Sequence, residues 1–105
     1  MILKKHIKDG KLIIALCDSY LSGRKFEEGT LQLDLTSNFY NGKDVPKESL
    51  RDEIRKAYII NAVGKESVEL LMKLALISEE YIIKIEGVPS AQILLGTEML
   101  TKPSV

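Results

Sequence analysis

The sequence has a single cysteine, Cys17, and a single histidine, His6. One cysteine cannot form a disulfide within the chain, which fits a reducing compartment. One cysteine and one histidine also exclude a Cys/His zinc site within one protomer, so we predict no metal. If residues 2–8 and 11–17 pair as a hairpin, Cys17 lies about 13 Å along the strand from the position opposite His6, which excludes a catalytic dyad.

Long apolar segments and an excess of charge of one sign are also missing. No apolar run reaches the roughly 18–20 residues that span a bilayer, and no signal-peptide core follows the first residues, so we expect a cytoplasmic protein without membrane partners. The formal net charge is zero at pH 7, which excludes a global field that attracts nucleic acid. The glycines are scattered, and none forms a phosphate-binding loop of the Walker or dinucleotide type.

Adjacent carboxylates do occur, but in positions that do not suit acid–base catalysis. They are Glu27-Glu28, Asp52-Glu53 and Glu79-Glu80. Neighbouring residues on a helix or strand point in different directions, so solvated surface is the better interpretation of all three pairs. Because the sequence supplies no activated nucleophile and no cofactor motif, we predict no cofactor and a binding module rather than an enzyme.

The composition is that of a globular protein. The 105 residues are 45% hydrophobic and 29% charged, and a chain of this length buries roughly two-thirds of its surface on folding, which is enough for one core. We expect a single domain over residues 1–96 and a frayed tail over residues 97–105.

Strand patterns occupy the N-terminal third of the chain. Residues 2–8 and 11–17 are apolar and β-branched runs separated by Asp9-Gly10, a dipeptide typical of two-residue type I′ turns, and they predict a β-hairpin. Residues 30–36 alternate, with three leucines on one face, and predict a strand with one solvated side.

A helical pattern follows these strands. Pro46 suits the first turn of a helix, and the apolar spacing predicts a helix over residues 46–63 that ends at Gly64. A second helix is predicted over residues 66–76. Its inner stripe is formed by Val68, Leu71, Met72 and Ala75. The short connection at Gly64 predicts that the two helices pack as a corner or a hairpin.

The C-terminal pattern is again that of strands. The runs at 81–86 and 91–95 predict a strand pair around a tight turn at residues 87–90, whereas residues 24–29 show no sustained period. The order of elements predicts an α+β fold: an antiparallel or mixed sheet made of the N-terminal hairpin, a middle strand and the C-terminal strand pair, with a two-helix pair packed on one face. The strand order stays open.

Charge is distributed unevenly along the chain. Residues 1–25 hold six basic residues against two acidic ones, a net charge of +4. One interpretation is a basic patch made of Lys4, Lys5, Lys8, Lys11, Arg24 and Lys25. The other is a strand pair whose lysines protect the edge of a sheet from pairing with another chain.

Polar and aromatic residues in the middle of the chain form a candidate binding surface. Asn61 lies on the apolar face of the first predicted helix, where its amide either caps backbone groups or forms a recognition site with Gly64 and Lys65. Phe39 and Tyr40 lie in a predicted loop. We expect Phe39 to anchor in the core, and for Tyr40 both core packing and stacking on a base stay open.

The last predicted turn contributes to the same candidate surface. Gly87 and Pro89 shape the turn, and Ser90 and Gln92 bring a hydroxyl and an amide to it. The turn either holds a ligand or merely joins two strands, and whether Gln92 touches Asn61 stays open.

Five segments together resemble a known family. They are Cys17-Asp18, Gly23-x-x-Phe26-x-x-Gly29, Phe39-Tyr40-Asn41-Gly42, Asn61-Ala62-Val63-Gly64 and Gly87-Val88-Pro89-Ser90-Ala91-Gln92. Their order and the chain length resemble the uncharacterised archaeal family DUF424, from the first strand to about Leu95. The resemblance implies an archaeal cytosolic protein without an established enzymatic activity. The positions that it carries over are Phe39, Tyr40, Asn61, Gly64, Gly87, Pro89 and Gln92. Members usually have histidine where this chain has Ser90, so no imidazole role is carried over there.

Two functions follow as predictions. The first is a non-enzymatic binding module associated with RNA or the translation machinery, with RNA or ribosome-associated proteins as partners; it rests on the basic N-terminal segment, the loop aromatics and the archaeal setting. The alternative is a protein–protein adaptor or a homo-oligomeric structural protein, suggested by the apolar richness of a short chain. An enzyme would require Asn61, Ser90 and Gln92 to converge in a closed pocket.

Overall fold

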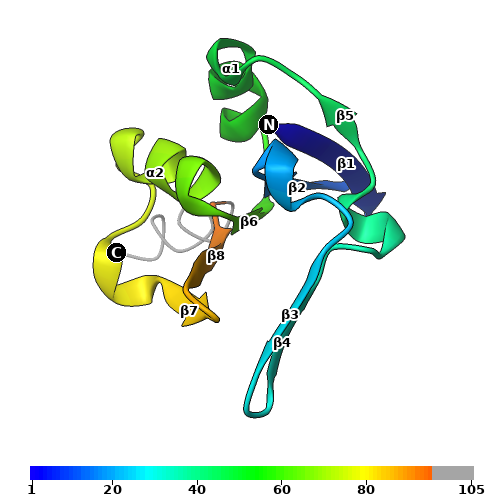
Figure 1. Cartoon of the computed structure of the whole chain (residues 1–105). Coiled ribbons are helices and arrows are strands. Elements are labelled where there is room, and N and C mark those ends of the chain that lie inside the picture. Colours follow the sequence, from blue (N-terminus) through cyan, green and yellow to red (C-terminus); the bar gives the residue numbers. More distant parts are fainter. Residues whose placement is uncertain (96–105) are drawn as a thin grey trace.

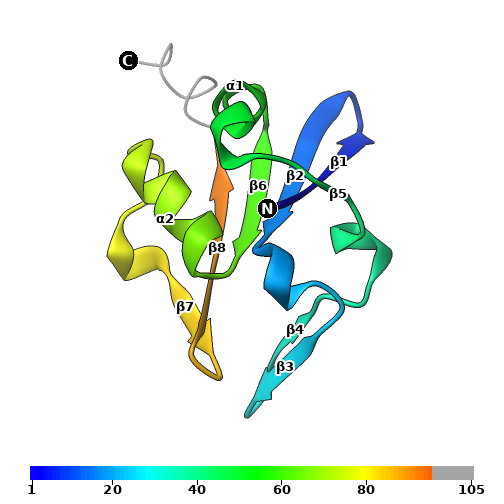
Figure 2. The same ribbon diagram turned by 45° about the horizontal axis from the view of Figure 1, so that its top comes forward.

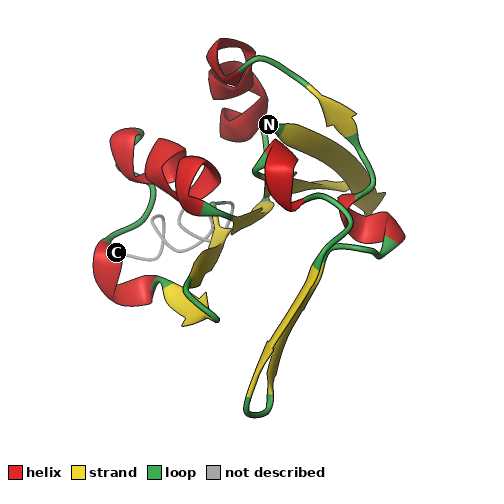
Figure 3. Ribbon diagram, in the orientation of Figure 1, coloured by secondary structure: helices red, strands yellow, loops and turns green. Residues whose placement is uncertain are grey.

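A computed structural model describes residues 1–95 of the protein (Figure 1). The tail expected over residues 97–105 lies outside the described residues. Strands form most of the regular structure, and the helices are short (Figure 3).

The chain begins with the predicted hairpin, formed by β1 (Ile2–Lys8) and β2 (Lys11–Cys17). Both residues of the Asp9-Gly10 turn have positive φ, 53° and 75°, as a type I′ turn requires. The hairpin and its turn are therefore confirmed.

The main sheet has six strands in the order β5-β1-β2-β6-β8-β7. The strands that join the hairpin are β5 (Lys43–Asp44), β6 (Ile59–Val63), β7 (Ile83–Ile85) and β8 (Val88–Leu94). Within the described residues, β2 and β6 are the only parallel neighbours in this sheet, and the other pairs are antiparallel. The sheet is therefore mixed, one of the two arrangements that the sequence predicts.

A second hairpin, which we call the arm, projects from the body of the molecule (Figures 1 and 2). It consists of β3 (Lys25–Glu28) and β4 (Leu31–Asp34). The sequence predicts β4, although as a longer strand, but not β3. Charged residues occupy three of the four β3 positions. The strand therefore lacks the alternation of apolar and polar residues by which a strand is predicted.

The helix predicted over residues 46–63 is wrong. A 3-10 turn (Lys47–Ser49) leads into the short α1 (Leu50–Arg55), and the chain then becomes β6 at Ile59. Apolar residues at helical spacing continue from α1 into β6, so the periodicity predicts one long helix where a helix and a strand are formed. The β-branched Ile59-Ile60 pair instead favours a strand, and β6 is buried between β2 and β8.

The second helix and the C-terminal strands are correct in kind but differ at their ends. α2 runs over Lys65–Lys73, directly after Gly64, so it ends before the predicted residue 76 and leaves Ala75 outside the helix. Met72 of the expected stripe is exposed. The C-terminal turn is Glu86-Gly87, both with positive φ, so the strand pair turns earlier than predicted. Pro89 consequently lies inside β8, opposite Lys84.

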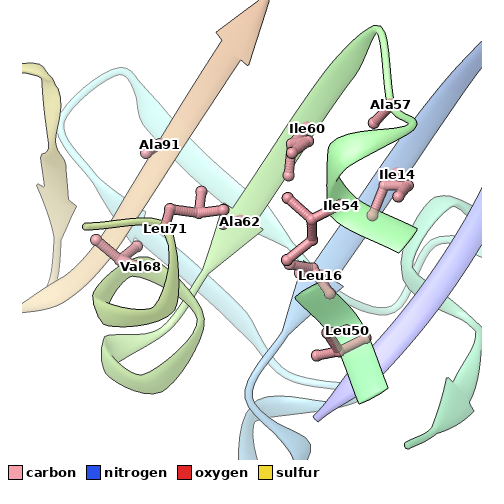
Figure 4. Close-up of a cluster of buried hydrophobic side chains, with 10 residues drawn as sticks. All are labelled: Ile14, Leu16, Leu50, Ile54, Ala57, Ile60, Ala62, Val68, Leu71 and Ala91. Atoms are coloured by element: carbon pink, nitrogen blue, oxygen red, sulfur yellow. The ribbon is translucent and has the colours of Figure 1, made fainter. Parts of the chain in front are cut away.

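The two helices do not form the expected helical hairpin, because β6 separates them in the chain. Both nevertheless cover the same face of the sheet, which we call the helix face (Figure 4). The core on that face is built from Ile14, Leu16, Leu50, Ile54, Ala57, Ile60, Ala62, Val68, Leu71 and Ala91. Single leucine or isoleucine truncations in such a core typically cost about 2–5 kcal/mol.

A smaller core lies on the opposite side of the sheet, which we call the open face. Its buried members are Cys17, Leu21, Phe26, Leu35, Val63 and Ile85. Phe26 and Leu35 come from the base of the arm, so this core fixes the arm against one end of the sheet. The open face elsewhere carries Asn61, Ser90 and Gln92, which are part of the binding surface that the sequence predicts.

Candidate functional site

Asn61 and Gln92 are direct partners across the antiparallel strands β6 and β8. Side chains alternate between the faces of a strand, and Ile60 and Ala62 contribute to the core on the helix face. The side chains of Asn61 and Gln92 therefore share the open face. Asn61 is a strand residue rather than a helix residue, and it does not cap the Gly64 corner: within residues 1–95 no hydrogen bond to its side chain is formed.

These two amides line a hollow of about 330 Å³, which we call the neutral hollow. Ser90 and Tyr40 also line it, and none of its lining residues is charged. Tyr81 and Ile83 stand at its side with 66% and 54% of their surface exposed. The hollow opens to solvent, so Asn61, Ser90 and Gln92 do not converge in a closed pocket here.

Of the two loop aromatics, Tyr40 takes one of the two roles left open for it, and Phe39 departs from its expected place in the core. Tyr40 packs against the smaller core, and burial raises the pKa of its hydroxyl to about 12. Phe39 is half-buried and stacks on the His6 ring, with centroids 4.6 Å apart and planes inclined by 6°. His6 Nε2 lies 3.0 Å from the Phe39 carbonyl oxygen, to which it donates in the tautomer that carries hydrogen there.

Three other predicted site residues lie elsewhere. Lys65, Gly87 and Pro89 line a separate hollow of about 760 Å³ beside α2. Pro89 and Ser90 are consecutive residues of β8, so their side chains project to opposite faces of the sheet. The nine predicted surface residues therefore do not form one site.

Gly64 has a structural role that depends on Asp18, a residue for which the sequence predicts no role. The Asp18 side chain is buried and accepts hydrogen bonds from the backbone N–H groups of Glu66 and Ser67 at 2.9 and 2.8 Å, and from the Ser67 hydroxyl at 2.8 Å. It thus caps the first turn of α2 from a position 48 residues away. A local sequence pattern cannot show a cap at that separation.

The basic residues divide into separate groups. Lys4 and Lys5 line a hollow of about 690 Å³ together with Lys43, Asn41 and Glu53, which we call the lysine hollow. Lys5 forms an ion pair with Glu53, and this bond lowers the pKa of the Glu53 carboxyl. The lysines and the one glutamate that line the hollow carry a formal net charge of +2, although Lys4 and Lys5 alternate along β1 and project to opposite faces of the sheet.

The remaining basic residues are more distant. Lys8 and Lys11 pair across the turn end of the first hairpin, and Lys11 lies over the Tyr58 ring at 4.9 Å. Arg24 lies over Phe26 at 5.0 Å and Lys25 pairs with Glu27. Because the length of β2 separates these groups by roughly 20 Å, the six residues do not form one continuous patch.

Cys17 and His6 lie at opposite ends of the hairpin, paired with Ile2 and Ile13 respectively. Cys17 is fully buried, and desolvation together with the Asp18 charge raises the pKa of its thiol to about 11. Such a thiol is protonated and unreactive at neutral pH. Among residues 1–95, no three His, Cys, Asp or Glu side chains are arranged to hold a metal ion.

No helix in the described part of the chain combines the length and the apolar character that a membrane span requires.

Comparisons with known proteins agree with this fold. The sequence model of a family described as "Protein of unknown function (DUF424)" matches residues 6–95. The fold is similar to the crystal structure of an uncharacterised conserved protein from Methanopyrus kandleri, with a TM-score of 0.75 and 28% sequence identity over 89% of this chain and 90% of that one. No curated protein matches the sequence.

Proposed function

Because this chain belongs to the DUF424 family of proteins of unknown function, its activity has to be inferred from its own surface, and we propose that it is a non-enzymatic RNA-binding protein. The observation that carries the proposal is the lysine hollow, whose lining includes Lys4, Lys5 and Lys43 but only one acidic residue, Glu53. A net charge of +2 at one place in a chain of zero net charge is the local excess that phosphate groups require.

The elements around the hollow favour a chain-like ligand over a free phosphate. The hollow lies where β5 and β1 meet the start of α1, at an edge of the sheet that a strand of RNA can follow. Lys8 and Lys11 form a separate pair of positive charges at the turn end of the same hairpin. The lysine hollow can contact only a few phosphates at once, which suits a single strand of RNA.

The charge of the whole protein sets the expected strength. With zero net charge and few phosphate contacts, binding is expected to be weak and strongly dependent on salt. RNA held in this way would be found in the cytoplasm as part of a larger assembly, and ribosomal RNA with its associated proteins is the partner that we propose.

The test compares matched pairs of lysine substitutions. Lys4→Gln with Lys43→Gln removes two charges from the hollow, while Lys73→Gln with Lys84→Gln removes two exposed charges elsewhere. Lys5 is left intact because its loss would leave Glu53 with only the longer contact to Lys56, at 3.8 Å. Fluorescence anisotropy with labelled single-stranded RNA at several salt concentrations measures both affinity and salt dependence.

We expect the hollow variant to bind at least several-fold more weakly and to lower the salt slope by about 1–2, with the control near wild type. Equal losses in the two variants would mean that the hollow has no special role. No binding by the wild-type protein at about 50 mM salt would refute the proposal.

A second candidate function is an adaptor or a homo-oligomer. Tyr81, Ile83 and Leu94 expose at least half of their surface, and β7 is an edge strand of the sheet. Exposed apolar side chains beside a free edge are typical of protein contacts. Light scattering tests this candidate: a dimer that persists on dilution and dissociates in Ile83→Lys supports it, and a monomer at every concentration removes the homo-oligomer.

A further inference from the structure

We infer that the neutral hollow on the open face is a pocket for one unpaired nucleobase, with adenine favoured over the other bases. The inference rests on the proposed RNA binding and adds the part of the RNA that the lysine hollow does not contact. It is carried by the side chains of the hollow, by their lack of charge and by the position of Tyr40.

The recognition groups are the two amides. Asn61 and Gln92 are opposite each other on β6 and β8, which places their β-carbons about 5 Å apart on one face. Each amide offers two donor hydrogens and an acceptor oxygen. Neither side chain hydrogen-bonds to another protein group within residues 1–95, so both are available to a ligand.

The chemistry of the lining selects an uncharged ligand. A carboxylate or phosphate placed here would lose hydration without gaining a countercharge, which is costly. A base has no charge, and its planar edge matches the donors and acceptors of an amide pair. Bidentate contact of Asn or Gln with the N6 and N7 atoms of adenine is the known geometry of this kind, which is why adenine is favoured.

The size and the lining of the hollow suit one nucleobase. Its volume of about 330 Å³ is at the lower end of the roughly 300–1,000 Å³ range for small-ligand sites. Tyr81 lines one side and is 66% exposed, so its ring can stack on a base at little cost. Stacking of this kind contributes about 1–3 kcal/mol per base in single-strand binding.

The backbone of one loop joins the two hollows. Tyr40 lines the neutral hollow, and the next residue, Asn41, lines the lysine hollow. The same loop therefore contributes to both hollows.

The test uses nucleosides, which contain a base but no phosphate. Side-chain NH₂ signals of Asn61 and Gln92 are followed by ¹H–¹⁵N NMR during titration with adenosine, cytidine or uridine, and with N-acetylglycinamide as a peptide-like amide. Gln92→Ala removes one exposed amide from the hollow. Gln32→Ala, on the exposed surface of β4, is the matched control.

We expect adenosine to shift both signals, to bind more tightly than the pyrimidine nucleosides, and to lose at least several-fold in affinity in Gln92→Ala but not in Gln32→Ala. Absence of shifts at millimolar adenosine overturns the inference, and so does an equal response to N-acetylglycinamide, which would identify a peptide site. The Lys4→Gln, Lys43→Gln variant separates the two proposals, because it should lose RNA and retain adenosine.

Discussion

Asp18 and Gly64 occupy adjoining space so closely that a β-carbon at position 64 would lie 2.3 Å from the Asp18 Cγ atom. The carboxylate must reach past this point to cap α2, and the backbone at Gly64 has φ 108°, which side chains rarely adopt. The pair therefore connects the end of β2 to the start of α2, and a substitution at either position disturbs the cap.

Asp18→Ala is expected to lower the free energy of unfolding by about 2–4 kcal/mol, because two backbone N–H groups and the Ser67 hydroxyl lose their acceptor. Urea denaturation measures the change. Asp52→Ala, at an exposed position on α1, is the control and should stay within about 0.5 kcal/mol of wild type. A wild-type midpoint for Asp18→Ala would show that the cap does not stabilise α2.

Gly64→Ala is expected to cost more than about 2 kcal/mol, since it combines a strained φ with the collision against Asp18. Gly29→Ala separates the two causes. Gly29 also has positive φ, but nothing lies within 4 Å of its β-carbon position, so that variant should lose only about 1 kcal/mol. Equal losses would mean that the contact with Asp18 contributes nothing.

Stability is expected to fall in mildly alkaline solution because of Cys17. The native pKa is about 11, above the value of about 8.5 in unfolded chains, so the folded state holds this proton more tightly. The contribution is complete below the unfolded pKa and is lost as pH rises through 11, by on the order of 2–3 kcal/mol. Urea denaturation between neutral pH and pH 10 measures this loss. Cys17→Ala should show a shallower decline, and the same decline in both proteins would contradict the prediction.

Phe39→Ala is expected to destabilise the protein by about 1–2 kcal/mol through loss of the stack on His6. Thermal unfolding followed by circular dichroism measures the change. Tyr81→Ala removes a larger but mostly exposed ring and should change stability by no more than about 0.5 kcal/mol. A similar loss in both variants would indicate that Tyr81 is part of the scaffold rather than a free binding residue.

The parts of the fold that depend on local chemistry are predictable from the sequence. Asp9-Gly10 defines the first hairpin, and Val68 and Leu71, half of the predicted stripe, are buried in α2. Residues 46–63 fail because one continuous apolar spacing covers a helix and a strand. The strand, β6, depends on pairing with β2, which is remote in the sequence. A local sequence pattern does not identify that partner.

The candidate site shows the same division. Asn61, Ser90, Gln92 and Tyr40 are each recognisable as polar or aromatic residues in unusual positions, and the structure brings these four to one hollow. Their grouping depends on the register of β6 with β8. Lys43 and Asp18 gave no signal of their own, because their roles depend on neighbours that only the tertiary structure supplies.

The parallel pairing of β2 with β6 also determines when the binding surface can form. Each antiparallel hairpin closes through a short turn, whereas β2 and β6 can pair only after the chain has closed a loop of residues 18–58. Closing a long loop is slow, because the chain loses conformational entropy before it gains the contacts between the strands. Asn61, Tyr40 and Lys43 all lie in or directly after that segment. Assembly of both hollows is therefore a late event in folding, and a partly folded chain would keep its first hairpin while being unable to bind its ligand.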